Sequence, residues 1–207
     1  MSNPWKEINL SDYENHMKLD SVKQLQSMNQ TMKQQLNDYD VHTVMILGIA
    51  GGNGLEHIGN KYHKVYGVDI NESYLKIVRE RYSNLSDVLE CLNIDIINAA
   101  DSLPESELLI ANLLIEYIGY DSFSKAVLKV KPKYISCVIQ INDNTKQWVS
   151  DSPYIHVFDG LDSVHCQMEE AKLTEVLKNI GYKFTKTSTD VLQNGKSLVR
   201  LDYELAL

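Results

Sequence analysis

The sequence predicts an α/β protein with a doubly wound, mostly parallel sheet of seven strands that ends in an antiparallel hairpin. Three observations carry this prediction. Short apolar runs typical of strands alternate with amphipathic helical segments between residues 43 and 141. The first run, residues 43–50, has no polar side, as expected for a strand buried on both faces of a parallel sheet. Near the C-terminus, two β-rich runs flank Asn194 and Gly195, a pair that favours a tight hairpin turn.

The other elements follow from the spacing of apolar residues. A stripe at three- and four-residue steps predicts a helix over residues 20–36, with Asp20 or Ser21 as its N-cap. Similar stripes predict further helices, over residues 72–82, 121–130 and 168–181. Apolar runs between turn residues predict further strands, over residues 64–70, 88–94, 106–112 and 134–141. After residue 142 the pattern lapses for a stretch whose length is more typical of a functional loop.

Composition limits the classes of function. The chain has 207 residues, 43% of them apolar, and 20 basic against 28 acidic residues give a formal net charge of -8. This length fits one domain, expected over residues 43–207, preceded by an N-terminal helical arm or lid over residues 1–42. The acidic balance argues against nucleic acid as a partner. No membrane-spanning stretch or secretory signal is evident, so we expect a cytoplasmic protein without a membrane partner.

The candidate ligand site begins in the turn after the first predicted strand. Small residues at positions 48, 50, 52 and 54 let the chain turn sharply and let a ligand approach the backbone. Asp69 ends the next strand, where a carboxylate can accept hydrogen bonds from both hydroxyls of a ribose. His57 replaces the third glycine of a dinucleotide fingerprint, and no lysine of a phosphate loop follows before Lys61. A nucleoside ligand without phosphates fits these features, with a plain strand-to-helix turn and an NAD-linked oxidoreductase as the alternatives.

In these features residues 43–205 resemble the class I S-adenosylmethionine-dependent methyltransferases. The first motif of that family, an acidic residue followed by three alternating glycines, is matched in order by Gly48, Ala50, Gly52 and Gly54. The resemblance implies a Rossmann-like methyltransferase fold with S-adenosyl-L-methionine as the cofactor. It also implies a set of cofactor-binding residues, namely Gly48, Ala50, Gly52, Gly54, Asp69, Ile70, Asp95, Ile96 and Asn112.

Within that set the resemblance assigns separate roles. Asp69 resembles the ribose-binding acid, and Asp95 with Ile96 resembles the pair that receives the adenine amino group and packs on its ring. Asn112 resembles the fourth motif, which borders cofactor and substrate. Asp95 and Asn112 also have a plain explanation, because such residues often end strands in turns. Since Gly48 stands at the acidic position of the first motif, the partner of the methionine amino group stays open, with Glu56 as a nearby candidate.

The activity implied by the resemblance is methyl transfer by in-line displacement, which needs alignment of donor and acceptor more than covalent machinery. A weakly acidic acceptor benefits from a base, for which the candidates are Glu116, Tyr117 and His165, together with His156, Asp159 and Asp162. We expect no metal, because the histidines, aspartates and Cys166 of the long loop lack the spacing of a known metal motif.

The acceptor is expected to be a small molecule. Asn112 is followed by Leu113-Leu114-Ile115, without the two prolines and the aromatic residue typical of nucleic-acid base methyltransferases. The alternative is a noncatalytic module that binds a nucleoside cofactor as a sensor or partner protein. Trp5, Tyr13, His16 and Met17 give the N-terminal segment a composition suited to a lid over the cofactor, and an arm docked on the sheet edge is the other interpretation.

Overall fold

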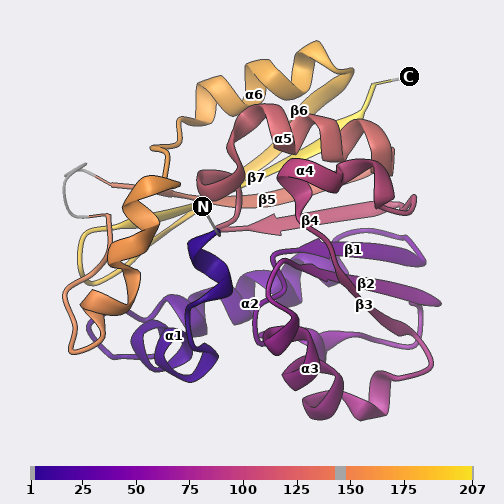
Figure 1. Ribbon diagram of the computed structural model, residues 1–207. Coiled ribbons are helices and arrows are strands. Elements are labelled where there is room, and N and C mark those ends of the chain that lie inside the picture. The colour runs from indigo at the N-terminus through magenta and orange to yellow at the C-terminus, as the bar shows by residue number, and fades with distance from the viewer. Residues whose placement is uncertain (1–2, 143–147, 207) are drawn as a thin grey trace.

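The computed structural model describes residues 3–142 and 148–206 and contains one seven-stranded sheet (Figure 1). Its strands are β1 Thr43–Leu47, β2 Lys64–Asp69, β3 Leu89–Asn93, β4 Leu108–Asn112, β5 Tyr134–Ile141, β6 Tyr182–Val191 and β7 Ser197–Leu205. They lie in the order β3-β2-β1-β4-β5-β7-β6, with β7 antiparallel to both β5 and β6 and the other pairs parallel. The predicted fold class, including the antiparallel C-terminal hairpin, is confirmed.

Helices cover both faces of this sheet. The α-helices are α1 Leu10–Met17, α2 Gln24–Asn37, α3 Glu72–Arg81, α4 Ile96–Ala99, α5 Ile115–Val130 and α6 Glu170–Asn179. Short 3-10 helices are η1 Pro4–Lys6, η2 Leu55–His57, η3 Ser83–Leu85, η4 Ala100–Ser102 and η5 Ile155–Ser163. Figure 1 shows α2 and α3 on one side of the sheet and α4, α5 and α6 on the other. Within the described ranges we find no helix with the length and hydrophobicity that a bilayer crossing needs.

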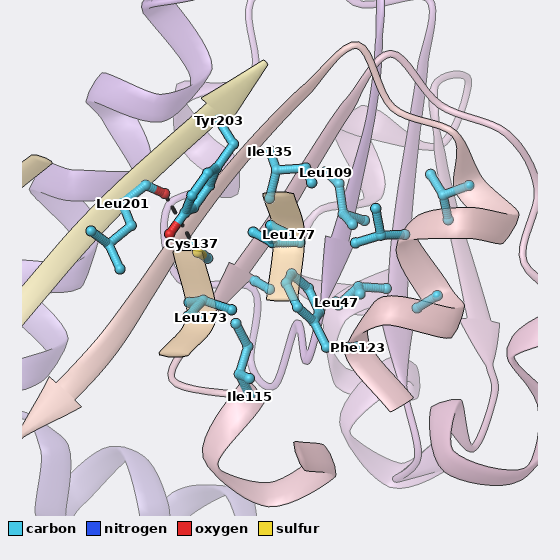
Figure 2. Close-up of a cluster of buried hydrophobic side chains, with 14 of the residues drawn as sticks. Leu47, Leu109, Ile115, Phe123, Ile135, Cys137, Leu173, Leu177, Leu201 and Tyr203 are labelled. Carbon is cyan, nitrogen blue, oxygen red and sulfur yellow. Dashed lines mark hydrogen bonds between the residues drawn. The ribbon is translucent and has the colours of Figure 1, made fainter. Parts of the chain in front are cut away.

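Two hydrophobic clusters hold these layers together. Successive residues of β1 alternate between them: Met45 and Leu47 face the α5 and α6 layer, whereas Val44 and Ile46 face α2 and α3. The larger cluster, drawn in Figure 2, packs Phe123 of α5 and Leu177 of α6 against the inner strands. Because β1 is buried on both faces, it forms the centre of the core, as its apolar run predicts.

Some boundaries differ from the predicted ones. The helix predicted from residue 20 begins at Gln24, after Lys23 in a left-handed conformation, so the predicted caps Asp20 and Ser21 are wrong. The helix predicted from residue 121 begins at Ile115 and is interrupted at Gly119, whose φ of 74° breaks the helical path. Leu114 makes no side-chain cap before this first piece, which explains why the sequence showed no start signal there.

Further differences concern the end of the first strand, the N-terminal segment and the long stretch after β5. The first strand ends at Leu47 rather than at residue 50, because Gly48 and Ala50 both take positive φ values. The N-terminal segment, expected as part of a helical arm or lid, forms η1 and α1, whose bounds the sequence did not predict. The stretch predicted as an irregular loop contains the nine-residue η5, and its Phe158 and Leu161 are buried together with Ile8.

Helix α2 packs closely on the turn that follows β1. Gly54 has a φ of 93°, and a Cβ built on it would lie 2.5 Å from Cγ and 2.6 Å from Cβ of Met32. Met32 is itself buried in the cluster with β1 and α3. A side chain at position 54 would therefore meet both an unfavourable backbone conformation and a filled space.

Gly54→Ala should consequently lower the free energy of unfolding by about 2 to 4 kcal/mol. Gly181→Ala is the matched control, because Gly181 has a nearly equal φ of 94° but nothing within 4 Å of an added Cβ. It should lose only about 1 kcal/mol from backbone strain. Urea unfolding of both variants and the wild type measures the difference, and equal losses would show that contact with Met32 is unimportant.

Candidate functional site

The candidate site lies at the carboxyl ends of the parallel strands, where the strand order reverses between β1 and β4. The turns after β1, β2, β3 and β4 and the N-terminal segment surround an open cavity of about 670 Å³ there. Its wall is formed by Asn3, Trp5, Tyr13, Gly48, Ala50, Asp69, Ile70, Tyr74, Ile94, Asp95, Ile96, Ile97, Asn112, Leu113, Leu114, Tyr117 and Ile118. We refer to this space as the first cavity.

Asp69 is the buried carboxylate of the first cavity, with 8% of its surface exposed. Its Oδ2 accepts the backbone N–H of Ala50 at 2.9 Å, and its Oδ1 accepts that of Asn71, also at 2.9 Å. Burial raises the pKa of Asp69 to about 6, although these backbone hydrogen bonds act in the opposite direction. Each carboxylate oxygen keeps acceptor capacity for a ligand, since one backbone N–H does not use both of its lone pairs.

The structure brings seven of the nine predicted cofactor-binding residues to this cavity, and Gly52 and Gly54 are the two that do not line it. A Cβ on Gly52 would lie 2.7 Å from the ring of Tyr82, so the two glycines make room for packing of the protein's own side chains. Their predicted contact with a ligand stays a prediction.

Asp95 and Asn112 face the first cavity and also have structural partners. Asp95 is the N-cap of α4 and accepts the N–H of Ile97 at 3.1 Å. The side-chain amide of Asn112 is paired with that of Gln35 in α2 through two hydrogen bonds of 2.8 and 2.9 Å. Asp95 therefore has the structural role in a turn that the sequence allowed as an alternative. Asn112 connects β4 to α2.

A second cavity, of about 520 Å³, adjoins the first and shares Trp5, Tyr13, Leu113 and Tyr117 with it. Its other lining residues are His16, Met17, Gln24, Glu116, Gln140, Trp148, Val149, Ser150, Phe158 and His165. Aromatic rings dominate this wall. The ring of Tyr117 lies 4.9 Å from that of Trp5, and the rings of Trp148 and His165 stack at 4.0 Å.

Glu116 is the only carboxylate in the wall of the second cavity, as far as the described residues show. Its side chain is 3% exposed, and Oε1 accepts the backbone N–H of Gln140 at 3.0 Å. Oε2 has no hydrogen-bond partner among the described residues. Burial raises the pKa of Glu116 to about 7. A buried acceptor oxygen without a partner is costly, and such an atom next to a cavity is available to a ligand.

A third cavity, of about 580 Å³, continues from the first along the glycine turn and contains Glu14 of α1. Both carboxylate oxygens of Glu14 bond to the guanidinium of Arg81. A Cβ on Gly51 would overlap Oε1 of Glu14, so the glycine at this position lets the carboxylate approach the turn. Glu56, the acid suggested by sequence, lines none of these three cavities and instead accepts hydrogen bonds from Asn29 and from the N–H of Gly54.

The long loop after β5 separates its predicted residues. Of these, only His165 lines the second cavity, and burial lowers its pKa. His156 and Asp159 form an exposed pair 3.2 Å apart, and Asp162 accepts the indole N–H of Trp148 at 2.9 Å. In residues 3–142 and 148–206 no group of three or more His, Cys, Asp or Glu is arranged to hold a metal ion.

The N-terminal segment spans the site. The carbonyl of Trp5 accepts a hydrogen bond of 2.9 Å from Asn71, and that of Ile8 accepts one of 2.8 Å from Tyr74. At the other end, Nδ1 of His16 lies 2.7 Å from Oγ of Ser152. Residues 4–17 thus connect α3 with the segment after β5, and Trp5 and Tyr13 line the first and second cavities.

Sequence reasoning missed several residues of the second cavity, among them Gln24, Gln140, Trp148 and Phe158. Two of them, Trp148 and Phe158, lie in the long segment after β5. We predicted that this segment is functional, but the prediction did not name these two residues. Glu14 carried no motif at all.

No protein-family model and no curated protein sequence matches the chain. Solved structures do. The N-methyltransferase NodS from Bradyrhizobium japonicum WM9, in complex with S-adenosyl-L-homocysteine, matches with a TM-score of 0.69 and 12% identity over 99% of each chain. Magnesium protoporphyrin IX methyltransferase (ChlM) from Synechocystis PCC 6803, with bound SAM, matches with a TM-score of 0.61 and 11% identity over 93% of this chain and 83% of its own.

The chain has the class I S-adenosylmethionine-dependent methyltransferase fold. This methyltransferase fold does not by itself decide the reaction. The (4+2)-cyclase SpnF has it too, with a TM-score of 0.66 and 9% identity over 88% of this chain and 83% of its own. Function must therefore be argued from the residues of the site.

The buried carboxyl groups of the two cavities, Asp69 and Glu116, give the stability of the protein a defined pH dependence. The folded-state pKa of Glu116 lies near 7, above its ordinary 4.5, so the folded state binds an extra proton between these values. The contribution of Glu116 to the free energy of unfolding therefore falls as pH rises through that window, by at most about 1.4 kcal/mol per pH unit. Asp69 acts in the same direction between its ordinary 3.8 and about 6. His16, whose pKa burial lowers to about 4, acts in the opposite direction.

Comparison of variants isolates the effect of Glu116. The stability of Glu116→Gln relative to the wild type should increase from about pH 5 to about pH 7 and then stay constant. Asp69→Asn should show its relative gain mainly below about pH 6. Urea unfolding across this pH range is the measurement, and a stability difference independent of pH would contradict the raised pKa values.

Proposed function

We propose that the protein binds S-adenosyl-L-methionine in the first and third cavities and transfers its methyl group to a small molecule. The observation that carries this proposal is the position of Asp69. Its carboxylate is held by the turns after β1 and β2 at the wall of a cavity whose other lining is largely apolar. This arrangement suits a ribose that donates two hydrogen bonds while its base lies against apolar side chains.

The three parts of the cofactor have separate candidate positions. Ile70, Ile94, Ile96 and Ile97 provide apolar surface for the adenine ring beside the carboxylate of Asp95. Asp69 is suited to the ribose. The third cavity leads from there along Gly48 and Ala50 towards Glu14. Because Gly48 replaces the acidic residue of the family motif, we assign the methionine ammonium group to Glu14, which comes from α1 instead of β1.

The second cavity is the proposed acceptor site. S-adenosylmethionine supplies an electrophilic methyl group on a cationic sulfur, so the protein's part is to align an acceptor with that group. The second cavity shares part of its wall with the first, and its lining of aromatic rings with a few polar groups is typical of small-molecule sites. The acidic composition supports a small molecule over nucleic acid, and the cytoplasmic location stays a prediction from composition.

Two other functions were left open by the sequence. A noncatalytic binding module would bind S-adenosylmethionine without releasing S-adenosylhomocysteine in the presence of any acceptor. The unpartnered Oε2 of Glu116, a residue of the second cavity, supports turnover over this alternative. An NAD-linked oxidoreductase gains no support, since His57 lies in η2 with Nε2 2.9 Å from Oδ1 of Asn29 and lines none of the three cavities.

The role of Asp69 can be tested by isothermal titration with S-adenosylmethionine and S-adenosylhomocysteine. Asp69→Ala should weaken both by about 30- to 1000-fold, because two hydrogen bonds to a charged group are lost. Asp101→Ala, which removes an exposed carboxylate in η4, is the control and should leave both affinities unchanged. An unchanged affinity in folded Asp69→Ala would contradict the assignment.

If Glu14 binds the methionine ammonium group, replacing Glu14 should weaken only those ligands that carry this group. Glu14→Gln should weaken S-adenosylhomocysteine about tenfold or more but leave 5′-methylthioadenosine unchanged, because that ligand lacks the amino-acid part. Glu80→Gln, at an exposed position of α3, removes the same charge outside the cavities and should change neither affinity. Equal weakening of both ligands by Glu14→Gln would show that α1 acts only as a cover over the site.

A further inference from the structure

The second cavity combines an unpartnered buried carboxylate oxygen with a wall of aromatic rings. Glu116 lines this wall, and its buried Oε2 has no hydrogen-bond partner in the described part of the chain. The ring of Tyr117 lies 4.9 to 6.1 Å from those of Trp5, Trp148 and His165, and the rings of Trp148 and His165 stack at 4.0 Å. Such an oxygen calls for a ligand that donates a hydrogen bond, because no protein group described here satisfies it.

The charges around the cavity favour a cationic ligand. No Lys or Arg side chain of the described ranges lines it. His16 and His165, which do, have pKa values lowered by burial and are therefore mainly neutral near pH 7. Within the wall itself a bound anion would face the negative charge of Glu116, whereas a bound cation would neutralise this buried charge.

Of the other titratable groups around the second cavity, most are neutral, and Lys196 is a cation outside the wall. The pKa values of four neighbours are raised by burial, so these groups stay neutral near pH 7: Tyr13 of α1, Tyr117 and Tyr120 of α5, and Cys137 of β5. Lys196 is not part of the cavity wall, but it donates a hydrogen bond to the carbonyl of Trp148, and its charge helps to lower the pKa values of His16 and His165. Indole and phenol faces attract cations, most strongly where water is excluded.

From these observations, and resting on the proposed function, we infer that the methyl acceptor is a primary or secondary amine whose ammonium proton is taken by Oε2 of Glu116. The amine enters as a cation, and transfer of its proton leaves a neutral amine and a protonated Glu116. The nitrogen lone pair then forms the new N–C bond as the C–S bond of the donor breaks, and that electron pair stays on sulfur as the neutral thioether. The product leaves as a methylated ammonium ion, and Glu116 returns its proton to solvent.

The adjoining walls place this acceptor next to the methyl donor. Trp5, Tyr13, Leu113 and Tyr117 line both the first and the second cavity. Glu116 immediately precedes Tyr117 at the start of α5, and its backbone carbonyl accepts the N–H of Cys166 at 2.7 Å. This contact and the bond from Gln140 hold the carboxylate between the end of β5 and the loop that supplies His165.

The first test measures ligand preference in protein saturated with S-adenosylhomocysteine. Benzylamine, 2-phenylethylamine and hexylamine are compared by calorimetry with the alcohol and the carboxylate of the same skeleton. At least one amine should bind about tenfold or more tightly than its alcohol, and its carboxylate should bind more weakly still. Failure of every amine to bind, or an alcohol or carboxylate that binds as well as its amine, would overturn the inference.

The second test uses Glu116→Gln with Glu170→Gln, at an exposed position of α6, as the matched control. With the best amine and saturating S-adenosylmethionine, Glu116→Gln should lower kcat/KM by about 100-fold or more near pH 7, and Glu170→Gln should not. Activity of Glu116→Gln should recover as pH approaches the pKa of the free amine, because the deprotonated substrate no longer needs a base. A Glu116→Gln variant that keeps wild-type activity, or loses it equally at every pH, would show that the carboxylate does not accept the proton.

Binding of S-adenosylhomocysteine separates this inference from the proposed function. If the wild type fails to bind S-adenosylhomocysteine, the proposed function itself is wrong. If the wild type and Glu116→Gln both bind it with equal affinity, the cofactor site is intact. The amine preference and the pH profile then report on Glu116 alone.

Discussion

The Asp69 carboxylate joins the turn after β1 to the turn after β2, and the geometry of the candidate site depends on this link. It accepts backbone hydrogen bonds from Ala50 in one turn and Asn71 in the other. The backbone supports the same register, since the N–H groups of Gly48 and Ile49 both bond to the carbonyl of Val68. Asn71 in turn caps α3 through the N–H of Ser73. One buried acid therefore positions two strand ends and a helix around the first cavity.

Such buried acids reduce the stability of the ligand-free protein. Removing a carboxylate from water disfavours its charged form, which is why the pKa values of Asp69 and Glu116 lie above the ordinary range. Asp69 recovers part of this cost from backbone N–H groups, whereas one oxygen of Glu116 recovers none from the described chain. Groups kept at such a cost are typical of ligand sites, where the missing hydrogen bonds come from the ligand.

The N-terminal segment completes both halves of the site. Trp5 and Tyr13 form part of the wall between the first and second cavities, and Glu14 reaches the glycine turn over Gly51. Arg81 of α3 holds Glu14 with both of its terminal nitrogens. On a fold shared by methyltransferases and at least one cyclase, residues of this kind, outside the common sheet, are the natural source of substrate specificity.

The alternating apolar runs and the small-residue turn determined the sheet, its C-terminal hairpin and the place of Asp69, because these depend on the local periodicity of one strand at a time. Local signals could not determine contacts between distant parts of the chain. Glu14 meets Arg81 across 67 positions, and Glu116 bonds to Gln140 across 24. Likewise, no cap marked the start of α5 at Ile115, and the stacking of His165 on Trp148 depends on how a long loop folds back. Only the tertiary structure decided which carboxylates are buried, because burial depends on neighbours that packing brings together.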